Sequence, residues 1–353
     1  IVTPGTIISD LALDEAKNNY LMCIVYIDRT FGLGVADIST GDFHVTEVDS
    51  VSRLVDEINK YMPSEIICNE AFYMSGVDIE ELKERLSLAI SALDNYYFDD
   101  DRCKSILKSH FKVERLEGLG LEDYETALIA SGALMHYLYE TQKNTLEQLT
   151  TIHPYQIGKY TIVDTSTRRN LELVETLREK QKRGSLLWVL DKTRTAMGAR
   201  MLRNFLEQPL IHKQQMEERL DAVEAFCNNP LARDELREYL NPIYDLERLL
   251  GKVSYKTANP RDLIAFRNSM EMLPHIKTVL KEIPGDANQK IESEIDGLED
   301  LFGLIGESIE EEPPITIREG GMIKEGYNED IDTLRRAKTE GKTWLAELEN
   351  TER

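Results

Sequence analysis

The spacing of apolar residues changes part-way along this chain, and that change constrains the fold more than any other feature. Up to about residue 145, strand-like runs such as Leu21–Ile27 alternate with stretches whose apolar residues recur every three to four positions. From about residue 165 onward only the helical spacing remains. Two units are therefore expected, an α/β unit over residues 1–145 and an all-α unit over residues 166–353, joined by a linker over residues 146–165.

The first unit is expected to begin with a three-stranded antiparallel meander. Leu21–Ile27 is almost continuously apolar, as in a strand buried on both faces, and short polar turns connect it to strands over 31–37 and 43–48. The further elements expected are helices over 50–62, 79–88, 99–109 and 124–142 and strands over 65–68 and 96–98. This order of strands and helices matches a ribonuclease-H-like α/β domain.

The second unit is expected to consist of long helices joined by short connections. Apolar residues from Ile291 to Ile309 keep a heptad spacing, which is typical of a continuous packed helix. Pro274 lies inside the apolar stripe of Leu263–Leu280 and is expected to kink or split that helix. The last helix, over residues 328–352, would be about 37 Å long at about 1.5 Å per residue.

The charge of the chain argues against a free-standing nucleic-acid-binding protein. The 353 residues include 42 lysines and arginines against 64 aspartates and glutamates, a net charge of −22. Phosphate contacts require a positive field, so only a local basic patch could hold DNA. Two basic islands exist: residues 102–115, with five bases against one acid, and residues 168–203, with ten bases against four acids.

The first island supplies the candidate partner-binding residues, which are Lys108, His110, Phe111 and Lys112. Phe111 is expected to be exposed among these bases. The alternative for both islands is a solvated face, or pairing with the chain's own excess of acids. The second island also contains apolar residues that are expected in the core: Leu186, Leu187, Leu190, Met197, Met201, Leu202 and Phe205. No DNA-binding residue is assigned.

No arrangement typical of catalysis, of a metal site or of a bound cofactor is found. Asp28, Asp37 and Asp42 lie at strand ends and in turns, whereas a metal-dependent nuclease needs carboxylates that converge on the central strand. Gly341-Lys342-Thr343 resembles the end of a phosphate-binding loop but lacks the earlier glycine, and Gly32-x-Gly34 lacks the third glycine of a dinucleotide-binding loop. The four cysteines form no CxxC and are expected to be buried thiols. The chain is therefore not expected to be an enzyme.

The location of the chain is expected to be cytoplasmic. No run of 18 apolar residues appears, so no membrane span is expected. There is also no basic segment followed by an apolar one, the pattern that directs secretion. The first residue is not Met, and a helical pattern runs on to Arg353 without a capping residue, so the sequence is expected to be a piece of a longer protein.

Eight short strings spread over the whole chain are more specific than any of these patterns. They are Val2–Thr6 (VTPGT), Ala36–Gly41 (ADISTG), Thr167–Leu173 (TRRNLEL), Gly184–Asp191 (GSLLWVLD), Met197–Leu202 (MGARML), Tyr244–Arg248 (YDLER), Ala258–Leu263 (ANPRDL) and Arg318–Asn328 (REGGMIKEGYN). In this order and spacing they resemble the bacterial MutS family of DNA mismatch-repair proteins.

The resemblance implies that the chain corresponds to the middle of that family's protein, with the connector domain followed by the core and lever domain up to the entry of the DNA clamp. The mismatch-reading domain, the clamp and the ATPase domain would lie outside it, so ATP and magnesium belong to the parent protein and no cofactor is expected here. Phe205-Leu206-Glu207 has the Phe-x-Glu pattern of the family's mismatch-reading wedge, but it ends an amphipathic helix in the wrong domain and is expected to be core.

The resemblance also implies a function. The chain would be a non-catalytic module that transmits ATP- and mismatch-dependent conformational change and offers a connector surface to MutL. Its other partners, through the parent, would be mismatched duplex DNA and a second MutS subunit. Long packed helices suit such transmission, with Pro154, Gly158 and Pro313–Gly321 as candidate hinges. The alternatives are a free-standing DNA-binding module that uses the second island and a ribonuclease-H-like nuclease.

Overall fold

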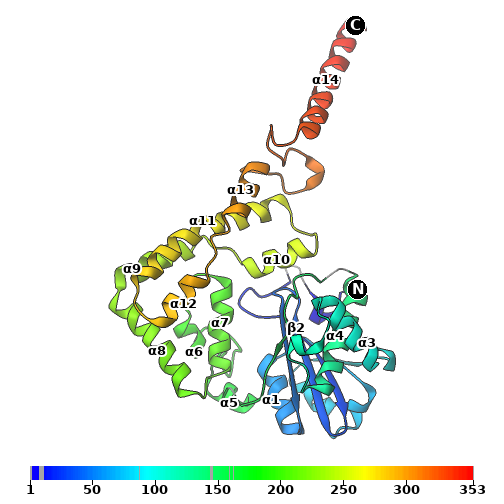
Figure 1. Ribbon diagram of the computed structural model, residues 1–353, viewed down its shortest axis with the longest axis vertical. Helices are drawn as coiled ribbons and strands as arrows, with labels where there is room; N and C mark the ends of the chain where they lie inside the picture. Colours follow the sequence, from blue (N-terminus) through cyan, green and yellow to red (C-terminus); the bar gives the residue numbers. More distant parts are fainter. Residues whose placement is uncertain are drawn as a thin grey trace.

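The computed structural model describes residues 2–7, 12–86, 88–143, 146–158, 160–161 and 163–352, and among these the side chains of all but residues 85, 165, 339, 342–350 and 352. An N-terminal unit (residues 2–158) is built around a sheet, and a helical unit (residues 160–352) lies beside it (Figure 1). The last helix, α14 (Glu329–Glu352), projects away from both units. The expected change from mixed α/β to all-α structure is confirmed.

The sheet has six strands in the order β5-β4-β1-β2-β3-β6. Their bounds are β1 (Leu21–Ile27), β2 (Thr30–Asp37), β3 (Asp42–Val48), β4 (Glu65–Cys68), β5 (Ala89–Ala92) and β6 (His153–Pro154). β1, β2 and β3 form the expected antiparallel meander, whereas β4 pairs parallel with β1, β5 with β4 and β6 with β3. The strand expected at 96–98 is wrong: Asn95–Phe98 is a 3₁₀ turn, and the fifth strand comes earlier in the chain.

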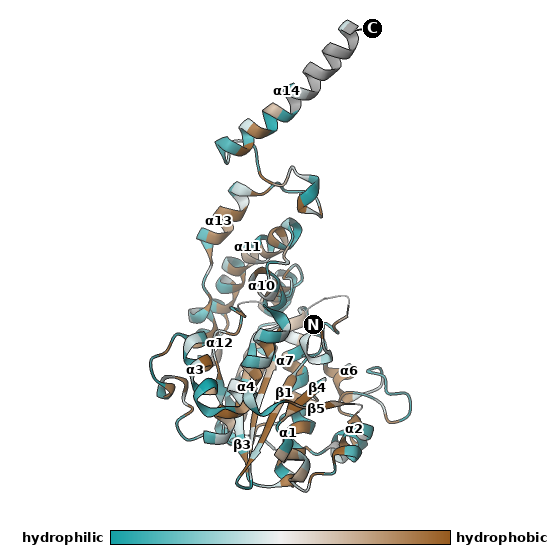
Figure 2. Cartoon of the chain, turned by 90° about the vertical axis from the view of Figure 1, so that its right-hand side faces the viewer, coloured by the Kyte–Doolittle hydropathy of each residue, from teal (hydrophilic) through white to brown (hydrophobic). Residues whose placement is uncertain are grey.

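Helices cover both faces of the sheet. Their bounds are α1 (Val51–Tyr61), α2 (Ile79–Leu86), α3 (Asp100–Phe111) and α4 (Glu125–Gln142), each within a few residues of the range expected. Because side chains alternate along β1, Leu21, Cys23 and Val25 pack on the face that carries α3 and α4, and the intervening residues pack on the face of α1 and α2. Figure 2 shows the strands of the sheet largely in brown, as expected for strands buried on both faces.

The two glycines of Gly32-x-Gly34 serve helix packing. A Cβ atom on Gly32 would lie 2.3 Å from the Thr126 carbonyl carbon at the start of α4, and one on Gly34 would lie 3.1 Å from the Ser131 Cα atom. The Glu47 carboxylate on β3 also accepts hydrogen bonds from the backbone N–H groups of Thr126 and Ala127, at 2.6 and 2.9 Å. The β2 glycines and this carboxylate hold the first turn of α4 directly on the sheet.

The helical unit contains α5 (Thr165–Asn170), α6 (Leu186–Leu190), α7 (Ala196–Glu207), α8 (Lys213–Asn228), α9 (Pro230–Leu240), α10 (Leu246–Ser254), α11 (Pro260–Glu282), α12 (Asp286–Glu294), α13 (Glu299–Ser308) and α14. The heptad spacing from Ile291 to Ile309 does not form one helix, because Ile295–Leu298 separates α12 from α13 and Leu298 adopts a left-handed conformation. Pro274 does not split α11, which runs through it from Pro260 to Glu282.

Most apolar residues expected in the core around α6 and α7 lie on the surface. Leu187 is buried, but Leu186, Leu190, Met201 and Phe205 are at least 40% exposed. The prediction that Phe205 is core is therefore wrong. The spacing of apolar residues identifies an apolar helix face but does not show whether another segment covers it, and within the described residues these faces are uncovered. Of the cysteines, Cys227 is exposed and the other three are buried.

Candidate functional site at the inter-unit junction

The four candidate partner-binding residues lie at the end of α3, but they do not form one exposed surface. The two ring nitrogens of His110 lie 2.6 Å from the Tyr139 hydroxyl and 2.7 Å from the Leu149 carbonyl oxygen, and burial lowers the pKa of its imidazole. Phe111 is half-buried against Phe43, with ring centroids 6.3 Å apart, so its predicted exposure is wrong. Lys112 is exposed and Lys108 is partly exposed.

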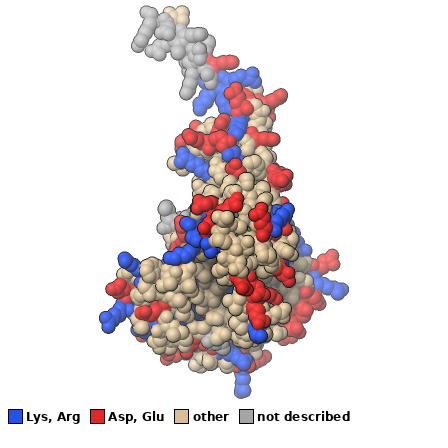
Figure 3. All heavy atoms as spheres, turned by 90° about the vertical axis from the view of Figure 1, so that its left-hand side faces the viewer, with Lys and Arg blue, Asp and Glu red and all other residues tan. Residues whose placement is uncertain are grey.

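Four of the ten bases of the second basic island form ion pairs within the chain. Arg168 and Arg203 both pair with Glu207, Arg200 pairs with Asp245, and Lys182 pairs with Asp191. Figure 3 shows basic side chains interspersed with acidic ones on one face of the molecule, without a continuous basic band. The alternative of internal pairing therefore describes these four bases better than a DNA-binding surface does.

The two units meet at a junction, where α10 of the helical unit makes the main contact with the N-terminal unit. Figure 1 shows α10 between α11 and the N-terminal unit. A Cβ atom on Gly251 of α10 would lie 2.9 Å from the Ser39 carbonyl oxygen, so only glycine allows this approach. Tyr255, just after α10, is buried in the core of the N-terminal unit, and burial raises the pKa of its hydroxyl to about 12. The helical unit thus inserts one ring into the other unit's core.

Two arginines of the helical unit bind backbone carbonyl groups near the N-terminus. Arg248 of α10 donates from Nη2 to the carbonyl oxygens of Asp14 and Lys17, at 2.9 and 2.8 Å. Arg200 of α7 donates from Nη1 to the Glu15 carbonyl oxygen at 3.0 Å. Both guanidinium groups are buried, so these hydrogen bonds are shielded from water and hold the segment that leads into β1.

Arg200 also joins α7 to the start of α10. Its Nη1 and Nη2 atoms donate to the two carboxylate oxygens of Asp245 at 2.6 and 2.8 Å, and Nη2 donates to Glu247 at 2.5 Å. Burial opposes the charge of this guanidinium, but the hydrogen bonds to Asp245 and Glu247 outweigh burial and raise its pKa. Asp245 also caps α10 by accepting the Arg248 backbone N–H. One buried arginine therefore fixes two helices and the N-terminal segment together.

The predicted linker is attached to both units. β6 pairs with β3, and the Thr46 hydroxyl donates to the Tyr155 carbonyl oxygen at 2.7 Å, so Pro154 is held in the sheet. Further on, the Thr161 N–H donates to the Pro209 carbonyl oxygen at 2.7 Å, which ties the segment to the end of α7. Of the candidate hinges, Gly158 lies between these two attachments.

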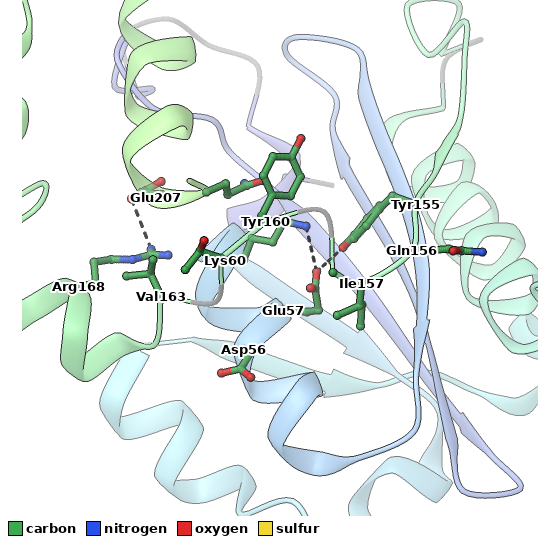
Figure 4. A pocket seen from close by; sticks show the side chains of 13 residues that line it. Asp56, Glu57, Lys60, Tyr155, Gln156, Ile157, Tyr160, Val163, Arg168 and Glu207 are labelled. Carbon is green, nitrogen blue, oxygen red and sulfur yellow. Dashed lines mark hydrogen bonds and ion pairs between the residues drawn. The ribbon is translucent and has the colours of Figure 1, made fainter. Parts of the chain in front are cut away.

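A lysine of α1 forms the centre of this attachment (Figure 4). The Lys60 ammonium lies 3.8 Å from the Tyr155 ring centroid and 5.6 Å from that of Tyr160, and it pairs with the Glu57 carboxylate at 3.3 Å. The Tyr155 hydroxyl also donates to Glu57. These contacts combine cation–π attraction with a shielded ion pair, so they fix the middle of the linker on α1.

Between α7 and the α1 face of the sheet lies a crevice of about 530 Å³. Asp42 of β3 lines it and accepts hydrogen bonds from the Tyr20 hydroxyl at 3.4 Å and from Asn18 at 3.3 Å. Burial raises the pKa of Asp42 to about 6, and the charges of Asp37 and Glu247 add to the shift. Burial lowers the pKa of the neighbouring His44 to about 4.

We expect Asp42→Asn to stabilise the chain by about 1–2 kcal/mol near pH 8 and to have little effect near pH 4. The pKa of Asp42 is about 6 in the folded chain and 3.8 in the unfolded chain, so the folded chain holds this proton more tightly. The stability that this proton contributes is fully present below pH 3.8 and is lost as the pH rises through 6. Asparagine keeps an acceptor for Tyr20 without the charge. Urea unfolding of both proteins at several pH values checks this; an equal effect at every pH would contradict it.

Sequence reasoning missed the junction residues Arg200, Arg248, Gly251 and Tyr255. Arg200 and Arg248 lie within two of the strings that carry the family resemblance, and that is the only signal that could have marked them. Among the described residues, no group of three or more His, Cys, Asp or Glu could hold a metal ion, and no helix is long and apolar enough to cross a membrane.

Comparison with known proteins accounts for both units. A family model described as MutS domain II matches residues 19–150, and one described as MutS domain III matches residues 166–352. The whole chain is 57% identical to the DNA mismatch repair protein MutS of Lachnoclostridium phytofermentans and 45% identical to that of Ruminiclostridium cellulolyticum. It spans 38% and 40% of the lengths of these relatives. The chain therefore belongs to the MutS family, of which it contains domains II and III.

Proposed function

We propose that this chain is the central, non-catalytic portion of a DNA mismatch-repair sensor and that it transmits conformational change between distant sites of the parent protein. The observation that carries the proposal is the junction, where buried arginines of α7 and α10 donate hydrogen bonds to carbonyl groups of the N-terminal segment. Because the two units share a core at Tyr255, a displacement of the helical unit must move the N-terminal unit or break these contacts.

Two further observations support this role. α14 projects far from the body, as a lever would (Figures 1 and 2). The strand order, with an antiparallel meander continued by parallel strands, supports a ribonuclease-H-like fold for the N-terminal unit. In this proposal mismatched DNA, ATP, magnesium and a second MutS subunit bind other parts of the parent, in the cytoplasm.

Arg248→Met in the full-length protein tests transmission. The methionine fills similar space but cannot hold the carbonyl groups of Asp14 and Lys17. We expect the effect of ATP on mismatch affinity to fall by about fivefold or more, because the coupling free energy depends on the intact junction. Mismatch affinity without nucleotide should change little.

The control for this experiment is Lys213→Met, which removes an exposed ion pair with Glu217 on α8. Titrations of mismatched duplex with and without ATP measure the coupling in both variants. Unchanged coupling in a folded Arg248→Met protein would contradict the proposal.

We further propose that Lys108 and Lys112 form part of a surface for MutL, with His110 and Phe111 as the half-buried support of the helix end. The side chains of the two lysines form no ion pair with a described residue, so they are available to an acidic partner. We expect Lys108→Glu with Lys112→Glu to weaken MutL binding about tenfold, chiefly through the association rate. Lys192→Glu, an exposed lysine of the helical unit, is the matched control. Equal MutL affinity of both variants would contradict the assignment.

A further inference from the structure

The crevice between α7 and the sheet has the size and lining of a ligand site. Its volume of about 530 Å³ lies within the range of about 300–1,000 Å³ that is typical of small-molecule sites, which favour the interfaces between domains. None of its polar lining residues belongs to the partner-binding surface proposed above. The inference that follows does not depend on the proposed function.

One wall of the crevice is formed by aromatic and imidazole rings of the N-terminal unit. The rings of Tyr20 and Tyr61 lie 5.1 Å apart edge to face, and the His44 ring lies 5.7 Å from that of Tyr61. His44 also neighbours His153 and Tyr155, at 5.8 and 6.3 Å. Tyr20 and Tyr61 are each only 7% exposed, so the rings of His44, His153 and Tyr155 are the part of this wall that a flat ligand can contact.

The other wall is one face of α7. Met197, Met201, Phe205 and Gln208 recur at helical spacing and line the crevice. Met201 is 59% exposed and Phe205 40% exposed, so apolar surface of α7 lines the crevice although the Arg219 guanidinium covers part of the Phe205 ring. Exposed apolar surface opposite a wall of rings favours a ligand with a flat, apolar ring system that lies between them.

Several polar groups that line the crevice lack hydrogen-bond partners in the described part of the chain. They are the imidazole of His44 and the side-chain amides of Asn204 and Gln208. Because burial lowers the pKa of His44 to about 4, its ring is neutral at pH 7 and can donate from one nitrogen and accept at the other. Amides also donate and accept, so the lining matches the edge of a heterocycle that does both.

An arginine side chain lies beside the α7 wall of the crevice. The Arg219 guanidinium lies 3.6 Å from the Phe205 ring centroid and forms no ion pair with a described carboxylate. The other cations of the lining, Lys60 and Arg200, are already paired with Glu57 and Asp245. Arg219 is therefore the lining cation that is available to an anionic group of a ligand.

We propose that this crevice binds a nucleobase that carries an anionic group, as in a nucleoside monophosphate. The base stacks between the rings of the N-terminal unit and the Phe205 and Met201 side chains of α7, and its edge meets His44 and the amides of α7. The phosphate pairs with Arg219. A base with an attached phosphate is present both in a free nucleotide and in a single unstacked nucleotide of a DNA strand, and the crevice fits either source.

Titration of the 353-residue chain with AMP tests the site, with ribose 5-phosphate as the anion without a base and adenosine as the base without an anion. We expect saturable AMP binding in calorimetry, with adenosine weaker and ribose 5-phosphate weakest. Phe205→Ala should weaken AMP binding about tenfold, because base–aromatic stacking contributes about 1–3 kcal/mol per base. Arg219→Gln should reduce the affinity for AMP to that for adenosine.

Leu220→Ala is the matched control, since Leu220 follows Arg219 on α8, is exposed and does not line the crevice. Its AMP affinity should equal that of the parent. Displacement of AMP by a short oligodeoxynucleotide at equal base concentration would identify a strand as the source, and its failure would identify a free nucleotide; both support the site. No AMP binding at concentrations up to about 10 mM would overturn the proposal. Equal affinity of AMP and ribose 5-phosphate, or an unaffected Phe205→Ala protein, would also overturn it.

Discussion

Arg200→Ala is expected to destabilise the chain by about 3 kcal/mol, because it removes the bidentate partner of the largely buried Asp245 carboxylate and leaves only the Arg248 guanidinium, 3.9 Å away, to balance its charge. The Arg200 side chain is 3% exposed, and that of Asp245, its bidentate partner, is 17% exposed. The same substitution removes the hydrogen bond to the Glu15 carbonyl group and opens a cavity beside α10. Urea unfolding followed by far-ultraviolet circular dichroism measures the loss.

The expected loss depends on burial, so an exposed ion pair provides the control. Lys213→Ala removes the pair with Glu217, whose side chain is 55% exposed, and should change stability by less than about 0.5 kcal/mol. Arg200→Lys should lie between the two, because an ammonium group keeps the charge but cannot bind both oxygens of Asp245 in a fork. A loss below about 1 kcal/mol for Arg200→Ala would contradict a buried network.

Gly32→Val is expected to cost about 3 kcal/mol or more, at the upper end of overpacking effects. The added Cβ atom would lie 2.3 Å from the carbonyl carbon of Thr126 and 2.4 Å from the Ala127 nitrogen, both of them backbone atoms that cannot rotate away. The start of α4 would have to leave β2 and the Glu47 carboxylate that caps it. Loss of the native thermal transition, or a lowered urea midpoint, measures the effect.

The control for this prediction is Gly303→Ala. Gly303 lies inside α13, and an added Cβ atom would meet nothing within 4 Å. Alanine should stabilise the helix by about 0.5–1 kcal/mol, since glycine loses more backbone entropy on folding. If both substitutions destabilised the chain equally, close packing of β2 on α4 would not explain the glycine at position 32.

The N-terminal unit was predicted in detail because its signals are local. Leu21–Ile27 is apolar throughout since both faces of β1 are covered, and β4 was predicted with its bounds, Glu65–Cys68. One strand of this unit was predicted at the wrong place. Tyr96–Phe98 has the aromatic composition of a strand but forms a 3₁₀ turn, while Ala89–Ala92 pairs with β4. Amino-acid composition indicates only which side chains favour a strand, whereas a strand also needs a neighbouring strand with free backbone hydrogen-bonding groups.

The helical unit was predicted less well because its signals depend on what packs against each helix. Ile291–Ile309 keeps a heptad spacing, yet the chain turns at Ile295–Leu298 and forms two shorter helices that pack with α11. Leu186, Leu190 and Met201 were expected in the core, but all three residues are exposed. Periodicity reports one face of a helix, and the position of that face relative to other segments is a tertiary property.

The sequence by itself determined the two-unit organisation, the strands and most helices of the N-terminal unit, and the family, since each follows from local spacing or from ordered strings. Tertiary structure alone decided the site. Arg200 and Arg248 have the composition of surface residues, and they are buried only because Asp245 and the carbonyl groups of residues 14, 15 and 17 meet them. The crevice likewise depends on the distance between α7 and the sheet. Neither arrangement has a local signature, because Arg200 and Asp245 are 45 residues apart and the carbonyl groups that the two arginines bind are more than 180 residues away, in the other unit.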